Sequence, residues 1–246
     1  MGAAIEMRGV TVRFPSRGGE VTALDGLDLT VEPGQVFGFL GPNGAGKTTA
    51  MHVLLGFTEA TAGTARLFGR DVRESIARQR IGYLPEHPDT YRFLTGHELL
   101  DTTARLFKLD GRTRRMRIEG SLEAVGIGDA AARRVATYSR GMMQRICLAQ
   151  ALINDPDLVI LDEPTGGLDP IGRMDIRRII GELRDRGKTV FFSSHELSEV
   201  ELVCDTLAIL CRGRIVAEGP ADTLVAPGER LEKVFMKVIA DAEASS

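Results

Sequence analysis

The chain has 246 residues, 43% of them hydrophobic, which is enough to bury a full core in one or two lobes. Its 31 basic and 34 acidic residues give a net charge of −3, and this near-balance excludes a general electrostatic attraction to nucleic acid or anionic lipid. No apolar stretch approaches the roughly 20 residues that cross a bilayer, and the N-terminal segment lacks a signal-peptide core, so we expect a soluble intracellular protein.

The first third of the chain has the pattern of β-structure around one helix. Short runs that alternate apolar and polar residues between 5 and 31, broken by Pro15 and by Gly18 and Gly19, predict antiparallel strands. The apolar run at 36–40 predicts a buried strand that leads through a glycine-rich segment into a helix. Two more strands are predicted, at 64–68 and 81–84.

Helical periodicity dominates the middle of the chain, from 87 to 155. Thr95 and Glu98 form a capping box, which predicts the start of a helix that runs towards Leu109. Two more helices are predicted, at 112–125 and 141–153. We therefore expect a helical insert between two parts of an α/β core.

Strands and helices alternate again after this insert. The apolar run at 158–161 predicts a strand of the kind that parallel sheets bury on both faces. The later elements are predicted as a helix at 171–186, a strand at 189–194, a hairpin of 207–210 with 214–217, a helix at 229–239 and a frayed end at 240–246. The three cysteines, Cys147, Cys204 and Cys211, are scattered in apolar patterns and predict buried free thiols.

The segment after the strand at 36–40 reads GPNGAGKTT, and this pattern between a strand and a helix is typical of a phosphate-binding loop. Its glycines let backbone N–H groups approach phosphate oxygens where a Cβ would interfere. Lys47 can reach the β- and γ-phosphates, and Thr48 offers a hydroxyl to Mg²⁺. We expect the whole loop to contact a nucleoside triphosphate: Gly41, Pro42, Asn43, Gly44, Ala45, Gly46, Lys47, Thr48 and Thr49.

Two carboxylates, Asp162 and Glu163, follow the strand at 158–161, where ligand sites of parallel sheets cluster. Asp162 is predicted to hold Mg²⁺ through a water, and Glu163 to orient or deprotonate the water that attacks the phosphate. His195 follows the next strand and would donate a hydrogen bond to a γ-phosphate oxygen, although a lone histidine is also commonly structural.

A second anion-binding site is predicted where the helix at 141–153 begins. Ser139 is a suitable N-cap, and Gly141 permits close approach of a ligand to the backbone. Because the chain already has a site for its own nucleotide, the second site is expected to close on a partner's ATP in a dimer. A simple helix cap is the alternative explanation.

Together these segments resemble the nucleotide-binding subunit of ATP-binding cassette (ABC) transporters over nearly the whole chain. GPNGAGKTT resembles the Walker A motif of that family, the segment at 158–163 its Walker B motif, YSRGMMQR its signature and the segment at 166–169 its D-loop, while His195 matches its switch histidine. The resemblance implies an α/β fold with a P-loop NTPase core, in which helices flank a mixed, mainly parallel sheet, with an N-terminal antiparallel β subdomain and a helical insert. The implied division is 1–86 with 156–227 for the core and β subdomain, 87–155 for the helical subdomain and 228–246 for the C-terminal helix and tail.

Three further positions are compared with the family pattern. Phe14 falls where the family places an aromatic residue that stacks on adenine, although strand packing explains it equally well. Glu86 stands where the family normally carries glutamine, and its carboxylate would be a further Mg²⁺ ligand beside Thr48 and Asp162. Arg140 stands where the commonest signature has glycine, and we expect it to face solvent, with contact to the opposing phosphates as the alternative.

The resemblance implies an ATPase that uses ATP and Mg²⁺, in which two copies of the chain, or this chain and a homologous cassette, enclose two ATP molecules. It also implies a separate polytopic permease, a peripheral position on the cytoplasmic face of the membrane and no nucleic-acid partner. The run at 81–88, with Glu86 and Arg140, resembles the type-2 exporter branch. The alternative is a soluble cassette ATPase that acts on ribosomes or DNA, which only the basic cluster at 112–117 favours.

Overall fold

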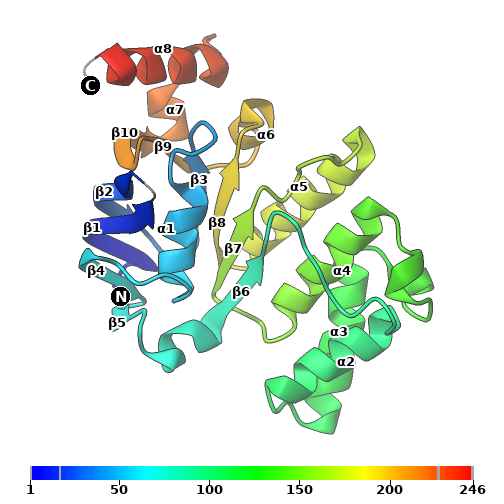
Figure 1. Ribbon diagram of the computed structural model, residues 1–246. Helices are drawn as coiled ribbons and strands as arrows, with labels where there is room; N and C mark the ends of the chain where they lie inside the picture. The colour runs from blue at the N-terminus through cyan, green and yellow to red at the C-terminus, as the bar shows by residue number, and fades with distance from the viewer. Residues whose placement is uncertain (1, 17, 226–227, 245–246) are drawn as a thin grey trace.

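The computed structural model describes residues 2–16, 18–225 and 228–244. Its strands are β1 Ile5–Ser16, β2 Gly19–Val31, β3 Val36–Leu40, β4 Ala62–Leu67, β5 Arg70–Asp71, β6 Ile81–Leu84, β7 Leu158–Asp162, β8 Thr189–Ser194, β9 Thr206–Cys211 and β10 Arg214–Pro220. Its α-helices are α1 Lys47–Leu54, α2 Gly96–Leu106, α3 Gly111–Ala124, α4 Arg140–Leu152, α5 Pro170–Asp185, α6 Leu197–Glu201, α7 Ala221–Leu224 and α8 Leu231–Ala244 (Figure 1).

The strands form two sheets. The first is antiparallel and has the order β2-β1-β4-β5. The second has the order β10-β9-β3-β8-β7-β6, in which β10 alone pairs antiparallel with its neighbour. This arrangement confirms the expected α/β class, with a mixed, mainly parallel sheet and an N-terminal antiparallel one.

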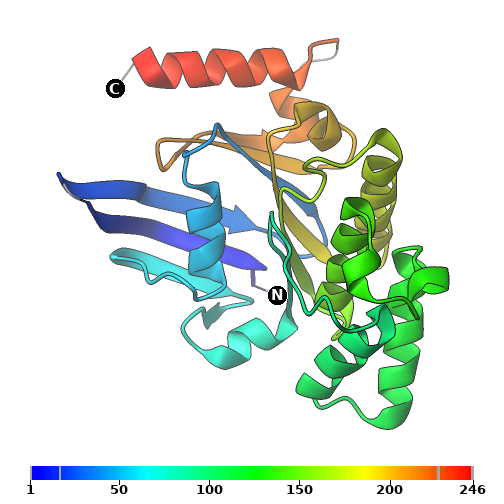
Figure 2. The same ribbon diagram turned by 45° about the vertical axis from the view of Figure 1, so that its right-hand side comes forward.

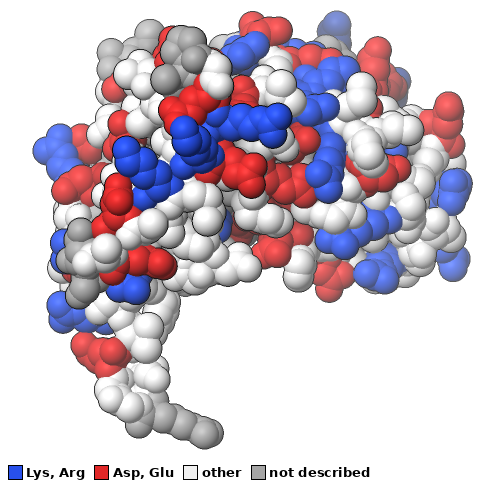
Figure 3. Space-filling view, turned by 90° about the horizontal axis from the view of Figure 1, so that it is seen from above, with Lys and Arg blue, Asp and Glu red and all other residues white. Residues whose placement is uncertain are grey.

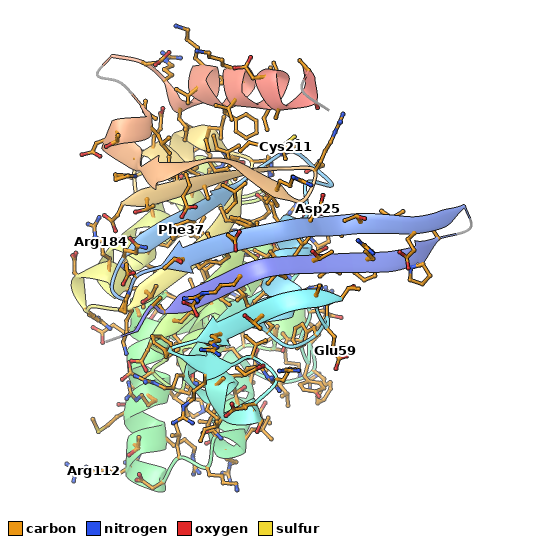
Figure 4. All side chains as sticks on the ribbon, turned by 90° about the vertical axis from the view of Figure 1, so that its left-hand side faces the viewer. Asp25, Phe37, Glu59, Arg112, Arg184 and Cys211 are labelled. Atoms are coloured by element: carbon orange, nitrogen blue, oxygen red, sulfur yellow. The ribbon has the colours of Figure 1, made fainter. Side chains whose placement is uncertain are left out.

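The second sheet is buried on both faces. Along β3, Phe37 and Phe39 face the antiparallel sheet and α1, while Val36 and Leu40 face the opposite side. Phe191 of β8 packs between the two phenylalanines, with ring centroids 5.7 Å from Phe37 and 5.2 Å from Phe39. Figure 4 shows Phe37 between the two sheets. These three rings belong to the apolar cluster that also contains residues of the antiparallel sheet and of α1.

The helices cover both faces of the second sheet. The helix α1 lies on the face shared with the antiparallel sheet, and α4 and α5 contribute to the apolar cluster on the other face (Figure 2). The helices α2, α3 and α4 pack against one another beside β6. The helix α8 packs over α6, β9 and β10. Within the described ranges, no helix is both long and apolar enough to cross a membrane.

The predicted helix starts agree with the structure in detail. The Thr95 hydroxyl accepts a hydrogen bond from the Glu98 N–H, and the Glu98 carboxylate accepts one from the Thr95 N–H, so the capping box at the start of α2 is confirmed. The Ser139 hydroxyl caps α4 by accepting from the Met142 N–H at 3.3 Å. The three cysteines are buried and free, as predicted.

Two expectations about the ends of elements were wrong. Pro15 does not interrupt β1 but pairs opposite Glu20 in a long two-stranded ribbon that projects from the sheet (Figure 4). Beyond Thr11 the strand β4 no longer pairs with β1, so the missing N–H of Pro15 breaks no ladder on that side. The helix α8 continues to Ala244 instead of fraying from Ala240, because alanines favour a helix, and the remainder of the predicted frayed end lies outside the described residues.

Replacing the central ring of this core should destabilise the protein strongly. Phe191 is fully buried, so Phe191→Ala removes its contacts and leaves a cavity between the sheets, at an expected cost of about 3–5 kcal/mol in the free energy of unfolding. Urea denaturation measures this cost. Phe93→Ala is the matched control, because its ring is 69% exposed and its loss should cost less than about 0.5 kcal/mol. Equal costs for both variants would contradict the assigned core.

Candidate functional site

A cavity of about 350 Å³ lies at the carboxyl ends of β3, β7 and β8. Asn43 to Thr49 of the glycine-rich loop line it, and so does Ala23 of β2. The structure brings the predicted residues Glu86, Asp162, Glu163 and His195 to the same cavity. Among the described residues that line it, neither Phe14 nor Ser139 nor Gly141 appears.

The glycine-rich loop needs its glycines for close packing. Gly46 has a φ of 108°, and a Cβ on it would lie 2.5 Å from the Ala23 carbonyl oxygen. A Cβ on Gly41 would overlap the carbonyl oxygen of Leu210 in β9. The loop therefore lies directly on β2 and β9, and this packing fixes the direction of its backbone N–H groups.

Lys47 is the first residue of α1 and only 7% exposed. Its Nζ donates a hydrogen bond of 2.7 Å to the Gly41 carbonyl and one of 3.4 Å to the Pro42 carbonyl. Burial lowers the pKa of the ammonium, and the negative charges of Glu163, Asp162 and Glu86 oppose that shift. The loop thus holds a buried cation at the point where an anionic ligand would enter.

Asp162 is buried and shares its two oxygens between two hydroxyl donors. Thr48 Oγ1 donates to Oδ2 at 3.2 Å, and Ser193 Oγ donates to Oδ1 at 2.6 Å. A carboxylate beside a hydroxyl suits Mg²⁺, which prefers oxygen ligands and usually takes one or two from the protein and the rest from phosphates and water. The donor set fits the predicted metal, and the half-exposed Glu86 carboxylate lies at the rim of the same cavity.

Glu163 is the most constrained residue of the site. Its φ is 49°, a left-handed conformation that a non-glycine residue rarely adopts, and the side chain is 9% exposed. Oε1 lies 3.9 Å from Lys47 Nζ, and Oε2 lies 2.7 Å from His195 Nδ1 and accepts a bond of 3.2 Å from the His195 N–H. The carboxylate is therefore fixed between a lysine and a histidine, and it faces the cavity.

The other predicted site residues lie elsewhere. Phe14 lies on the projecting ribbon, paired with Val21 and 42% exposed, so its contact with adenine stays a prediction. Ser139 lies at the exposed start of α4, and it lines a second cavity of about 390 Å³ together with Glu86. Arg140 is exposed, as expected, and its Nη2 also donates a hydrogen bond of 3.1 Å to the Gly166 carbonyl of the same chain.

Sequence reasoning missed two residues that hold the site together. Ser193 donates to Asp162 and accepts a bond of 3.0 Å from the Glu163 N–H, so one hydroxyl connects both carboxylate residues. Gln144, 4% exposed, donates from Nε2 to the Pro164 carbonyl at 3.1 Å. Each carried a signal, because a polar side chain at an otherwise apolar, buried position needs a partner.

The fold and this site together define an ATP-binding cassette. The sequence model of the ABC transporter family matches residues 24–166. The chain therefore belongs to the ABC transporter family.

Curated relatives agree with this assignment. An uncharacterized ABC transporter ATP-binding protein of Nostoc sp. is 48% identical over 208 residues, 84% of this chain and 62% of the relative. A fluoroquinolones export ATP-binding protein of Mycobacterium tuberculosis is 39% identical over 234 residues, 94% of this chain and 75% of the relative. This chain spans 62% of the length of the Nostoc protein and of a similar Synechocystis protein.

A solved structure of an ATP-binding subunit of an ABC transporter has the same fold. It superposes with a TM-score of 0.86 at 26% identity, over 96% of this chain and 99% of the other. The likeness thus includes the helical elements between β6 and β7 as well as the two sheets.

Removing the Ser193 hydroxyl should weaken the site and the fold together. In Ser193→Ala the buried Glu163 N–H loses its acceptor and Asp162 loses a donor, at an expected cost of about 1–3 kcal/mol in the free energy of unfolding. Urea denaturation measures the cost, and titration with Mg²⁺ and nucleotide measures the loss of affinity. Ser16→Ala, on the exposed end of β1, is the control. A Ser193→Ala variant as stable as this control would contradict the role of the Ser193 hydroxyl in connecting Asp162 with Glu163.

Proposed function

We propose that this chain binds ATP with Mg²⁺, hydrolyses it and thereby drives export through a separate membrane permease. The observation that carries this proposal is the Glu163 carboxylate, held between Lys47 and His195 at the edge of the glycine-rich loop. Phosphoryl transfer to water needs charge stabilisation and a positioned base, and this arrangement supplies both.

In the proposed reaction the loop N–H groups and Lys47 hold the β- and γ-phosphates. Glu163 takes a proton from the attacking water, whose oxygen bonds to the γ-phosphorus as the bond to the bridging oxygen breaks and ADP leaves. His195 holds Glu163 through Nδ1 and, being 58% exposed at its side chain, remains free to approach the γ-phosphate. Mg²⁺, when bound, neutralises charge on the phosphate oxygens, and Thr48 and Asp162 would hold it, with Glu86 as a further ligand.

A second chain completes the proposed site. Ser139 and Gly141 lie at the start of α4, where helix N–H groups and the helix dipole favour an anion. Since neither residue is among those described as lining the cavity of Lys47, the nucleotide they would bind belongs to a second copy of this chain or a homologous cassette. ATP would favour the closed dimer, and loss of the γ-phosphate would release it.

The proposed permease contact involves exposed apolar side chains between β6 and α4. Tyr91 and Phe93 are 61% and 69% exposed, and their ring centroids lie 5.8 Å apart. Leu106 and Phe107 at the end of α2 are exposed as well. Exposed aromatic groups of this size commonly mark a protein contact. We propose that 87–155 is the helical subdomain that couples the core to the permease. In the same division, 1–86 with 156–227 form the core and the β subdomain, and 228–246 the C-terminal helix and tail. The subunit would be peripheral to the cytoplasmic face of the membrane.

Export is proposed from the relatives. Besides the fluoroquinolones protein, a Nod factor export ATP-binding protein of Paraburkholderia xenovorans is 41% identical and a bacitracin transport ATP-binding protein of Enterococcus faecalis is 40% identical. Their names cite three chemically different cargoes. We infer that the permease, and not the cassette, selects what is moved.

A nucleic-acid or ribosome partner has less support. In the basic cluster at 112–117, Arg114 pairs with Asp101 at 2.8 Å and Arg117 with Asp155 at 2.9 Å. The face seen in Figure 3 has basic and acidic side chains interspersed, without a continuous basic patch.

The role of Glu163 is tested by Glu163→Gln. The amide cannot accept the water proton, so hydrolysis should fall by about 10²–10⁴-fold while ATP binding is kept. The closed dimer should then accumulate with ATP, which size-exclusion chromatography detects. Glu119→Gln, an exposed change on α3, is the control. Turnover at the control rate in Glu163→Gln would remove Glu163 from this role.

The transporter assignment is tested by purifying the tagged chain from mildly solubilised native cells, identifying its partners by mass spectrometry and assaying the membrane fraction for the chain. A polytopic membrane protein in near-equal amount is the expected result. Ribosomal or DNA-associated partners, with the chain absent from membranes, would contradict it.

A further inference from the structure

Two side chains of α4, one helical turn apart, bind the loop that joins β7 to α5. The buried Gln144 donates to the Pro164 carbonyl at 3.1 Å, and the more exposed Arg140 donates to the Gly166 carbonyl at 3.1 Å. Residues four apart lie on the same face of a helix, so a single face of α4 holds this loop at two points. Among the described residues, Arg140 forms no ion pair, and its guanidinium is committed to the loop.

The Gly166 peptide connects this contact to the base. The Gly166 N–H donates a hydrogen bond of 3.0 Å to the carbonyl of Glu163, while the Gly166 carbonyl accepts from Arg140. Two consecutive hydrogen bonds therefore lead from the start of α4 to the backbone of Glu163. That backbone is in the left-handed conformation with φ of 49°, which persists only where its surroundings hold it.

Gly167 makes room for the arginine. A Cβ on Gly167 would overlap Cζ and both terminal nitrogens of Arg140, so the guanidinium occupies the space beside Gly167 where a side chain would begin. Gly167 also has a φ of 65°, which disfavours any side chain. The absence of a side chain at 167 thus gives the Arg140 guanidinium the space that it occupies.

The far side of the loop is held by α5. Arg173 donates from Nε to the Leu168 carbonyl at 3.1 Å, and its Nη1 lies 2.5 Å from the carboxylate of Glu196, the residue after His195. The loop is therefore fixed between α4 on one side and α5 on the other. The side chains of Arg140, Gln144 and Arg173 bind this loop. Of the three, only Arg140 is next to Ser139 and Gly141 in the sequence.

We propose that Arg140 is a positioning residue that couples the start of α4 to Glu163 through the Gly166 peptide. This proposal rests on the proposed function, in which Ser139 and Gly141 bind the partner's ATP. A displacement of the start of α4 by that nucleotide is transmitted to the loop after Glu163, so occupation of one site adjusts the base of the other. Arg140 acts here through its own chain and not by binding phosphate.

A double-mutant cycle of Arg140→Ala and Gly167→Ala tests the contact in steady-state ATP hydrolysis. Arg140→Ala should lower kcat by about fivefold, the factor of one net hydrogen bond, and leave KM for ATP within about twofold. Gly167→Ala keeps the cation but displaces it and adds strain at a positive φ, so it should lower kcat at least to the same extent. The loss in the double variant should then be smaller than the product of the two single losses, because both changes break one contact.

The cycle also distinguishes loss of the contact between Arg140 and the loop from two other causes of a lower activity, backbone strain at Gly167 and loss of phosphate binding by Arg140. If strain at Gly167 were the whole cause, Gly167→Ala would lower kcat by its full factor again in the Arg140→Ala background, and such fully multiplied losses overturn the proposal. A raised KM for ATP in Arg140→Ala, with Gly167→Ala unaffected, would mean that Arg140 binds the partner's phosphates, which also overturns it. Arg112→Ala, which removes an exposed arginine from α3, is the control and should leave both constants unchanged.

Hydrogen exchange of the full chain without nucleotide tests the contact independently of hydrolysis. Arg140→Ala and Gly167→Ala should each speed exchange of the Gly166 amide at least about fivefold and leave that of amides in β8 unchanged. Unchanged exchange at Gly166 in Arg140→Ala overturns the proposal, even if the wild-type chain proves to be an ATPase. Faster exchange in a chain that does not hydrolyse ATP would instead support the contact and refute the proposed function.

Discussion

Parallel pairing of β3, β7 and β8 is the constraint on which the site depends. Leu40 pairs with Ser194 and Asp162 pairs with Ser193, so the three strands end at the same edge of the sheet. The glycine-rich loop, the two carboxylate residues and His195 all begin where their strands end. The aromatic contacts of Phe191 with Phe37 and Phe39 join β8 to β3 directly below this edge, so the packing of the core supports the positions of the site residues.

Burial of charge is the second constraint. Lys47, Asp162 and Glu163 are all buried, and an isolated buried charge would be costly. Here the cation bonds to loop carbonyls, Asp162 accepts from two hydroxyls, and Glu163 contacts both Lys47 and His195. Because burial lowers the pKa of Lys47 while the carboxylates oppose this, removal of either acid should favour the neutral amine. Each buried charge of the site is thus stabilised by the others, and removing either acid changes the protonation of Lys47.

Much of the fold was predictable because its signals are local. Periodicity and the caps at Thr95 and Ser139 gave the longer elements to within a few residues, while the short β5, α6 and α7 were missed. The glycine-rich loop identified the edge of the sheet where the site lies. The contacts that hold Glu163 were not predictable, since they join residues far apart in sequence. Ser193 bonds a residue 30 positions away and Arg140 one 26 positions away, and no local pattern encodes such distances.

Arg140 shows why a departure from a family pattern is best interpreted with its neighbours. Considered alone, an arginine beside a capping serine has two simple explanations, exposure to solvent or contact with phosphate. In the folded chain its guanidinium occupies the space that a Cβ at 167 would need, so a side chain at 167 would displace it. A glycine with positive φ would usually be explained by its turn alone. Here Gly167 also leaves room for the Arg140 side chain, which binds the loop after Glu163. Both the positive φ and the space for this side chain therefore favour glycine at 167.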